Sequence, residues 1–122
     1  MRIYLSHSSS FDFNSELYEP LKQSQLNIQH QIYFPHDTVN IDVKSKEVIQ
    51  KVDLLIAEVS YASTGQGIEL GWAEAQNIPI ICFYKLTSKF SSSLKFVTSD
   101  IIEYSDENDF LDKLGNCLAV SQ

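Results

Sequence analysis

The sequence contains few cysteines and no arrangement of residues typical of a metal site. Its two cysteines, Cys82 and Cys117, lie far apart and outside any Cys-x-x-Cys spacing. This argues against a disulfide framework or a zinc site and favours a reducing compartment. Both cysteines lie in apolar segments, so we expect buried thiols. His36, Asp37 and Asp42 do not have the spacing of metal ligands. We therefore predict no metal and no cofactor.

The sequence also lacks a long apolar run and a cluster of basic residues. No apolar segment approaches the length of a membrane-spanning helix, and the first six residues enter a strand pattern without an apolar leader. These features predict a cytoplasmic protein with no membrane partner. The net charge is −7, from 9 basic and 16 acidic residues, which argues against binding to polymeric nucleic acid. The net charge does not exclude a small anionic ligand that backbone amides and hydroxyls bind.

Strand and helix patterns alternate along the chain and predict a single α/β domain over residues 1–122. Segments 54–59 and 79–84 are almost continuously apolar, as expected of strands covered on both faces. Further strands are predicted at 2–6, 31–35 and 101–104, and helices at 12–25, 42–51, 66–77 and 106–120. This alternation favours a doubly wound, mostly parallel sheet of the flavodoxin or Rossmann type, in the order 2-1-3-4-5.

The ligand crevice of such a sheet lies at the carboxyl ends of strands one and three. Two loops meet there: the serine-rich residues 6–10 and residues 60–67, which end in Gly65-Gln66-Gly67. We predict that these glycines let the backbone turn tightly beside a ligand. Glu69 then lies about one turn inside a helix, where the helix dipole favours a carboxylate. On position alone, capping or dipole stabilisation is its more common role, and action as a nucleophile or electrostatic stabiliser is the alternative.

Three consecutive segments carry a resemblance to a known family. An apolar strand over residues 52–60 ends in Ala57-Glu58, and after a short loop Gly-x-Gly-x-Glu-Leu-Gly over residues 65–71 opens a helix. The similarity continues through residues 77–82. In these segments the chain resembles the nucleoside 2-deoxyribosyltransferase family, which includes 2′-deoxynucleoside 5′-monophosphate N-glycosidases.

The resemblance implies a chemical role for Glu69. A glutamate at this position attacks C1′ of a 2-deoxyribose and displaces the base, and a second base or water resolves the glycosyl ester. Tyr4 matches a tyrosine that holds the nucleophile or the sugar in the family. An equally good interpretation is that Tyr4 is an aromatic side chain of the hydrophobic core. Glu58, at the end of the third strand, has two equal readings: it orients Tyr4 or touches the sugar, or it satisfies neighbouring loop amides.

Several hydroxyl residues match family positions near the 5′ end of the substrate. Ser63 stands where the transferases carry an acid for the 5′-hydroxyl and where the nucleotide hydrolases carry a serine near the 5′-phosphate. Ser8 and Ser93 also match hydroxyl positions of the hydrolases, and we expect all three to converge on one pocket with Gly65 and Gly67. A hydroxyl donates to a phosphate that a carboxylate would repel, so the sequence favours a 5′-monophosphate over a nucleoside.

The chain departs from the family at three positions. Ser45 stands where an aspartate assists protonation of the leaving base, and Ser10 stands where the hydrolases carry a phosphate-binding arginine. His7 replaces a glycine. We count His7 among the substrate-binding candidates, as a cation or a proton donor, with an exposed loop residue as the alternative reading.

These observations predict an enzyme that cleaves or exchanges an N-glycosidic bond in a 2′-deoxynucleoside or its 5′-monophosphate. The alternative is a nucleotide-binding or sensing module that keeps the pocket and has lost the chemistry. Related enzymes complete each pocket with residues from a neighbouring subunit, which implies at least a homodimer with residues 91–96 as the contributed segment. Trp72, Phe90 and Phe96 are then candidate interface aromatics, with core packing as their common alternative.

Overall fold

The computed structural model describes residues 1–121, and its centre is a five-stranded parallel sheet in the order β2-β1-β3-β4-β5. The fold class and strand order predicted from the sequence are confirmed. All neighbouring strands run parallel, so each connection crosses over a face of the sheet. The strands are β1 (Arg2–His7), β2 (Gln31–Tyr33), β3 (Leu54–Glu58), β4 (Ile80–Lys85) and β5 (Ile101–Tyr104).

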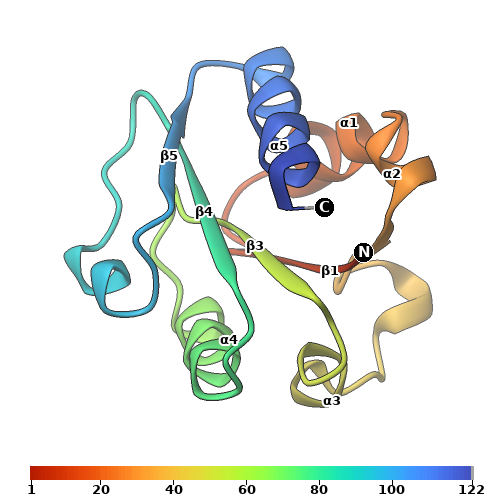
Figure 1. Ribbon diagram of the computed structural model, residues 1–122, viewed down its shortest axis with the longest axis vertical. Coiled ribbons are helices and arrows are strands. Elements are labelled where there is room, and N and C mark those ends of the chain that lie inside the picture. The colour runs from red at the N-terminus through yellow and green to blue at the C-terminus, as the bar shows by residue number, and fades with distance from the viewer. Residues whose placement is uncertain (122) are drawn as a thin grey trace.

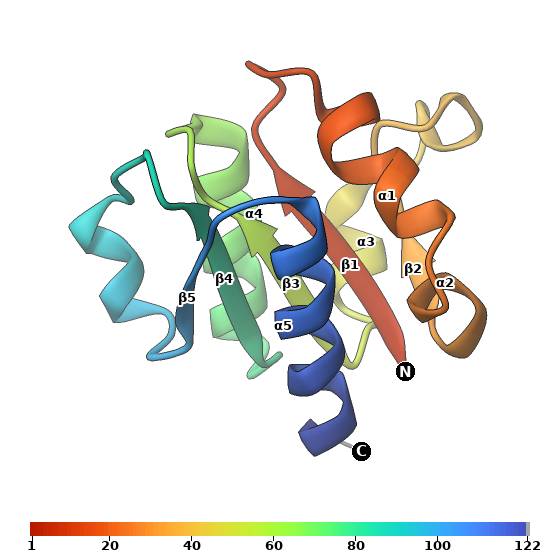
Figure 2. The ribbon, with the colours of Figure 1, turned by 90° about the horizontal axis from the view of Figure 1, so that it is seen from above.

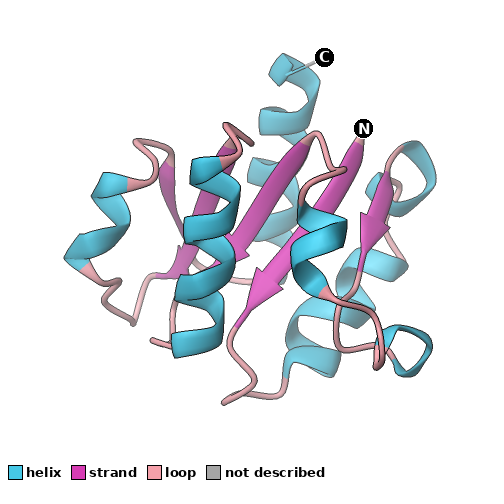
Figure 3. Cartoon of the chain, turned by 90° about the horizontal axis from the view of Figure 1, so that it is seen from below, coloured by secondary structure: helices cyan, strands magenta, loops and turns pink. Residues whose placement is uncertain are grey.

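The helices form two layers, one on each face of the sheet (Figure 1). One layer contains α1 (Glu19–Lys22), α2 (Leu26–Gln29) and α5 (Glu107–Ser121), and α5 lies in front of β3 in Figure 2. The opposite layer contains α3 (Ser45–Ile49) and α4 (Thr64–Ala75), which lie in front of the sheet in Figure 3. This two-sided cover explains why every residue of β3 is buried.

Alternating side chains of β1 divide the core into two clusters. Ile3 and Leu5 pack in the cluster that includes α5 residues, whereas Tyr4 packs in the cluster that includes α3 and α4 residues. Successive side chains of a strand point to opposite faces, so Tyr4 and Ser6 share the face covered by α3 and α4. The site described below is built on that face.

The helix predicted over residues 12–25 is interrupted. A π-helical turn, Asn14–Tyr18, runs directly into α1, and Pro20 follows that turn as the second residue of α1. The predicted helix over 42–51 is also shorter, since only Ser45–Ile49 is α-helical.

The predicted tight turn at Gly65-Gln66-Gly67 is wrong. Ser63 has extended backbone and its Oγ accepts the amide hydrogen of Gln66 at 3.4 Å, so α4 begins at Thr64 and takes both glycines into its first turns. Neither glycine has a positive φ. At the start of α5, the Asp106 side chain accepts from the backbone N–H of Asp109 at 2.8 Å, so Asp106 caps the helix.

Neither Cys82 nor Cys117 forms a disulfide in the described part of the chain. Cys82 is fully buried, as predicted, and burial raises its pKa to about 12. Cys117 is only half-buried.

Within residues 1–121, no helix has the length and apolar character needed to cross a membrane.

Candidate active site

Glu69 is held by two hydroxyl groups of β1. The Tyr4 hydroxyl donates a hydrogen bond to Glu69 Oε2, and Ser6 Oγ donates one to Glu69 Oε1 at 2.8 Å. Both donors are fully buried, whereas Glu69 is half-buried. The carboxylate therefore has both oxygens bound on the protein side and one side open to solvent.

These contacts exclude the capping role for Glu69. A capping residue would bond the first-turn amides of α4, but Ser63 fills that place. Glu69 lies further along α4 and bonds side chains of β1 instead. The geometry is that of a fixed carboxylate beside a cavity, which suits a nucleophile or an electrostatic stabiliser.

Tyr4 links Glu69 to α3. Its hydroxyl shares a second hydrogen bond, 2.8 Å long, with Ser45 Oγ at the start of α3. Burial and, next, the charge of Glu69 raise the pKa of Tyr4 far above its ordinary value, so the phenol stays protonated and remains a donor. A phenol has a single proton, so Ser45 donates in the second bond while Tyr4 donates to Glu69. The position where the family carries an aspartate is therefore in direct contact with Tyr4.

A polar cavity of about 350 Å³ opens beside Glu69. Its wall combines Glu69 and Ser45 with the segment that follows β2, and that segment supplies the titratable side chains of His36 and Asp37. Asp37 also bonds Lys22 at 2.8 Å. The remaining lining residues are Pro35, Asn40, Ile41 and Val43.

A groove of about 400 Å³ lies along the N-terminal part of α4. Three predicted residues line it: Ser63, Gly67 and Ser93. Ser63 and Ser93 come from the loop after β3 and from the 3-10 helix Ser92–Phe96, so the structure brings distant hydroxyls together here. No lysine or arginine is among the residues that line this groove.

Ser8 does not join this groove, and Gly65 is not among its lining residues. Ser8 is buried, and its hydroxyl bonds that of Ser10 at 2.8 Å. The expected convergence of three serines is therefore wrong for Ser8 and holds for the other two. Nothing lies within 4 Å of the position where a Cβ on Gly65 or Gly67 would be, so both glycines leave open space at the start of α4.

His7 is neither an exposed loop residue nor a cation. It ends β1, is 4% exposed, and packs against Phe11, Phe13 and His36. Its Nε2 bonds the Tyr18 hydroxyl at 2.6 Å, and its Nδ1 bonds the Ser8 carbonyl oxygen at 2.7 Å. Burial lowers its pKa to about 4, so the ring is neutral at pH 7. Residue 7 points to the opposite face from Tyr4 and Ser6, which explains why it does not reach Glu69.

Glu58 does not contact Tyr4. Its carboxylate accepts from the backbone N–H of Ser60 at 2.7 Å, from Ser60 Oγ at 2.9 Å and from the Tyr104 hydroxyl. Of the two readings of Glu58, the structure therefore shows the one in which it satisfies the loop after β3. Gln66 adds a bond from its side-chain amide to the Glu58 carbonyl oxygen, which ties α4 to the end of β3.

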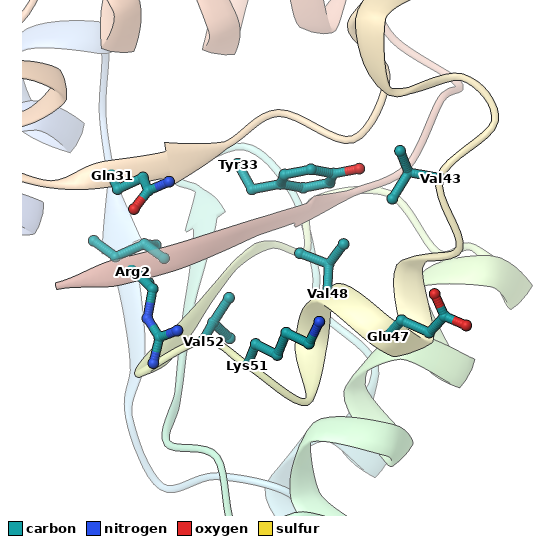
Figure 4. Close-up of a pocket in the computed structure, with 9 residues that line it drawn as sticks. Arg2, Gln31, Tyr33, Val43, Glu47, Val48, Lys51 and Val52 are labelled. Atoms are coloured by element: carbon teal, nitrogen blue, oxygen red, sulfur yellow. The ribbon is translucent and has the colours of Figure 1, made fainter.

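A third cavity, of about 310 Å³, lies between β2 and α3 and contains none of the predicted residues (Figure 4). Gln31 and Tyr33 form one side, and Val48 and Lys51 form the other. The Tyr33 ring stacks on Tyr4 with centroids 5.5 Å apart. Tyr33 therefore borders this cavity and also packs against the ring whose hydroxyl holds Glu69. Among residues 1–121, no three His, Cys, Asp or Glu side chains are grouped as metal ligands.

One sequence relative carries the name of a 2′-deoxynucleoside 5′-phosphate N-hydrolase, in Syntrophotalea carbinolica. It is 56% identical over 36 residues, which cover 30% of this chain and 25% of that protein. The aligned stretch therefore spans a quarter of the relative's length. No known family profile matches the chain.

Solved structures resemble nearly the whole chain. A CMP N-glycosidase from Clostridium botulinum superimposes with a TM-score of 0.68 at 22% identity, covering 94% of this chain and 99% of that one. A 2-deoxyribosyltransferase from Bacillus psychrosaccharolyticus gives a TM-score of 0.63 at 17% identity, covering 90% of each chain. The chain has the nucleoside 2-deoxyribosyltransferase fold. The resemblance stated from the sequence is confirmed.

Sequence reasoning missed Ser6 as a partner of Glu69 in this 2-deoxyribosyltransferase fold. The first strand was predicted to end at residue 6 and pass into a loop, but β1 continues through His7. The two-residue alternation of the predicted strand already places Ser6 on the same face as Tyr4, but Ser6 was counted with the serine-rich loop and given no role. The segment after β2 was also missed, because its approach to Glu69 depends on tertiary packing and leaves no local pattern.

Proposed function

We propose that this chain cleaves or exchanges the N-glycosidic bond of a 2′-deoxynucleoside or its 5′-monophosphate, with Glu69 as the nucleophile. The observation that carries the proposal is the Glu69 carboxylate, bonded by Tyr4 and Ser6 on one side and open to a polar cavity on the other. Its place in the fold adds support, because ligands of doubly wound sheets bind at the carboxyl ends of the strands.

In the first step, a Glu69 oxygen attacks C1′ of the sugar while the bond from C1′ to the base nitrogen breaks. The electron pair of that bond leaves with the base, which takes up a proton, and a glycosyl ester of Glu69 remains. Water or a second base then attacks C1′, loses a proton and restores the carboxylate. This is the retaining route of glycosyl transfer, and Tyr4 holds the carboxylate throughout.

The leaving base needs a proton donor other than Ser45, because a serine hydroxyl is a poor acid at neutral pH. His36 and Asp37 line the same cavity as Glu69 and are its other titratable residues. An imidazole can act as a general acid, which suits His36 to donate a proton to the base. The groove with Ser63 and Ser93 then takes the 5′ end of the ligand.

The test is a chromatographic assay of free-base release from 2′-deoxynucleosides, their 5′-monophosphates and ribonucleotides. We expect Glu69→Gln to lower release by roughly a thousandfold or more, because removal of a nucleophile abolishes the covalent route. The substitution keeps the size of the side chain, so the fold should persist. Glu74→Gln is the matched control, since Glu74 is an exposed carboxylate on the same helix.

Substantial activity in the Glu69→Gln protein would exclude Glu69 as the nucleophile. Denaturing mass spectrometry of the parent during turnover should show a deoxyribosyl adduct on the peptide that contains Glu69. Ligand binding by the parent without any base release would favour the nucleotide-binding alternative over the enzyme.

A further inference from the structure

We propose that Ser6 is a positioning residue that fixes the orientation of the Glu69 carboxylate for attack on the sugar. The inference rests on the proposed function and adds to it a group that the family resemblance does not assign. Ser6 acts through Glu69 and is not expected to touch the substrate.

The two hydroxyls of β1 bind different oxygens of one carboxylate. Tyr4 donates to Oε2 and Ser6 donates to Oε1 at 2.8 Å. The donors lie two residues apart on the same face of one strand, so their spacing is set by the backbone of a central strand. A carboxylate bonded at one oxygen can still rotate about its side-chain torsions, whereas bonds to both oxygens select one orientation.

The strand itself does not need the Ser6 hydroxyl. Ser6 is fully buried in β1 and pairs across the sheet with Ala57, where alanine would also fit. Glu69 is half-buried, so its carboxylate stays partly solvated when the Ser6 bond is removed. The apolar side chains of Leu70 and Ala73 pack α4 into the core independently of this bond. The contact therefore fixes Glu69 more than it fixes the fold.

The first measurement needs no substrate. Three-bond NMR couplings of the Glu69 side chain should report a single rotamer in the parent and rotamer averaging in Ser6→Ala. Ser24→Ala is the matched control, because it removes a partly buried serine hydroxyl that donates to the Leu21 carbonyl oxygen at 2.7 Å, far from Glu69. We expect the control to keep the single rotamer. A single unchanged rotamer in Ser6→Ala would overturn the inference.

The second measurement separates positioning from packing. We expect Ser6→Ala to lower kcat by about 10- to 100-fold, since small misplacements of a reacting group have effects of this size. KM should stay within about twofold, and the melting temperature should stay near that of the parent. Ser6→Cys nearly keeps the volume but is a weak donor, so its kcat should fall between those of the parent and Ser6→Ala.

The outcomes distinguish this inference from the proposed function. Base release by the parent with equal kcat in Ser6→Ala would overturn the role of Ser6 and leave Glu69 as the nucleophile. A kcat in Ser6→Cys equal to that of the parent would also count against it, because volume alone would then suffice. A parent that releases no base would overturn the proposed function, while the rotamer measurement would still decide whether Ser6 orients Glu69.

Discussion

At the scale of single residues, His7 shows how burial determines protonation. Its ring lies between aromatic side chains, and both nitrogens bond to groups of the protein. Burial is the largest cause of its lowered pKa. The nearby His36 lowers the pKa further, and the Ser8 carbonyl partly opposes the shift. A neutral imidazole fits this environment because it can donate through one nitrogen and accept through the other.

The lowered pKa of His7 predicts a pH-dependent part of the stability. Its pKa is about 4 in the folded state and about 6.5 in an unfolded chain. Between these values the unfolded chain binds a proton that the folded chain does not, so the free energy of unfolding rises with pH and falls on acidification. Over the whole range between these two pKa values, the free energy of unfolding changes by about 3 kcal/mol. We expect the parent to lose about 2–3 kcal/mol more than His7→Gln between pH 7 and about pH 4.5.

Urea unfolding of both proteins at the two pH values measures this difference. Carboxylates titrate in the same range, but they do so in both proteins and cancel in the comparison. Equal losses in parent and variant would show that the folded state also protonates His7 above pH 4.5.

The sequence placed Glu69 correctly beside a crevice, but it did not predict all the side chains that form hydrogen bonds around Glu69. The motif indicated Glu69 because its glycine and leucine neighbours are contiguous in sequence. Ser6 and Ser45 reach the same cluster from β1 and α3, and their contacts arise only from packing. His7 was misread because a histidine after a strand pattern does not reveal which aromatic side chains will enclose it.

At the scale of elements, the start of α4 combines a structural role with a binding role. Ser63 caps the helix and also lines the groove beside it. The first-turn amides of a helix favour an anion, but no cationic side chain lines the groove. A preference for a 5′-phosphate must therefore come from hydroxyls and amides. We expect that preference to be about tenfold, since a charge-assisted hydrogen bond contributes roughly 1.5–3 kcal/mol.

Ser63→Asp tests this preference without removing the cap. Aspartate is also a preferred N-cap residue, so the melting temperature should change little, while its carboxylate should repel a phosphate. Calorimetry in the Glu69→Gln background, which keeps the ligand intact, would compare each of the four common 2′-deoxynucleosides with its 5′-monophosphate. We expect tighter binding of the monophosphate, and loss of that preference in Ser63→Asp. Ser63→Thr, which keeps the hydroxyl, should retain it. Equal binding of both ligands by the Ser63 protein would contradict the phosphate assignment.

At the scale of the whole molecule, topology was the most predictable property. The apolar runs of β3 and β4 indicated strands buried on both faces, and the alternation with helices then left few possible arrangements. The helix ends were less predictable. Ser63 starts α4 before the glycines, and Pro20 joins a π-helical turn to α1, because capping and tertiary packing override local patterns.

We propose that the chain assembles at least as a homodimer, as the resemblance implies. Phe96 ends the 3-10 helix Ser92–Phe96 and is 87% exposed, which is unusual for a large aromatic side chain. The same helix borders the groove through Ser93 and Leu94. A partner that covers Phe96 would therefore also lie beside the proposed binding site. Phe90 is half-buried against Tyr84 and is the weaker interface candidate.

Sedimentation velocity at micromolar concentration tests the assembly. We expect the parent to sediment as a dimer and Phe96→Ser to raise the dissociation constant by about thirtyfold or more, as expected for a central aromatic anchor. Leu86→Ser is the control, because Leu86 is also an exposed apolar residue but lies after β4 and does not line the groove beside α4. It should leave the dimer intact. If dimerisation completes the site, the Phe96→Ser protein should release less base when dilute. Its activity should recover at high protein concentration, where the dimer forms again. A parent that sediments only as a monomer would exclude this assembly.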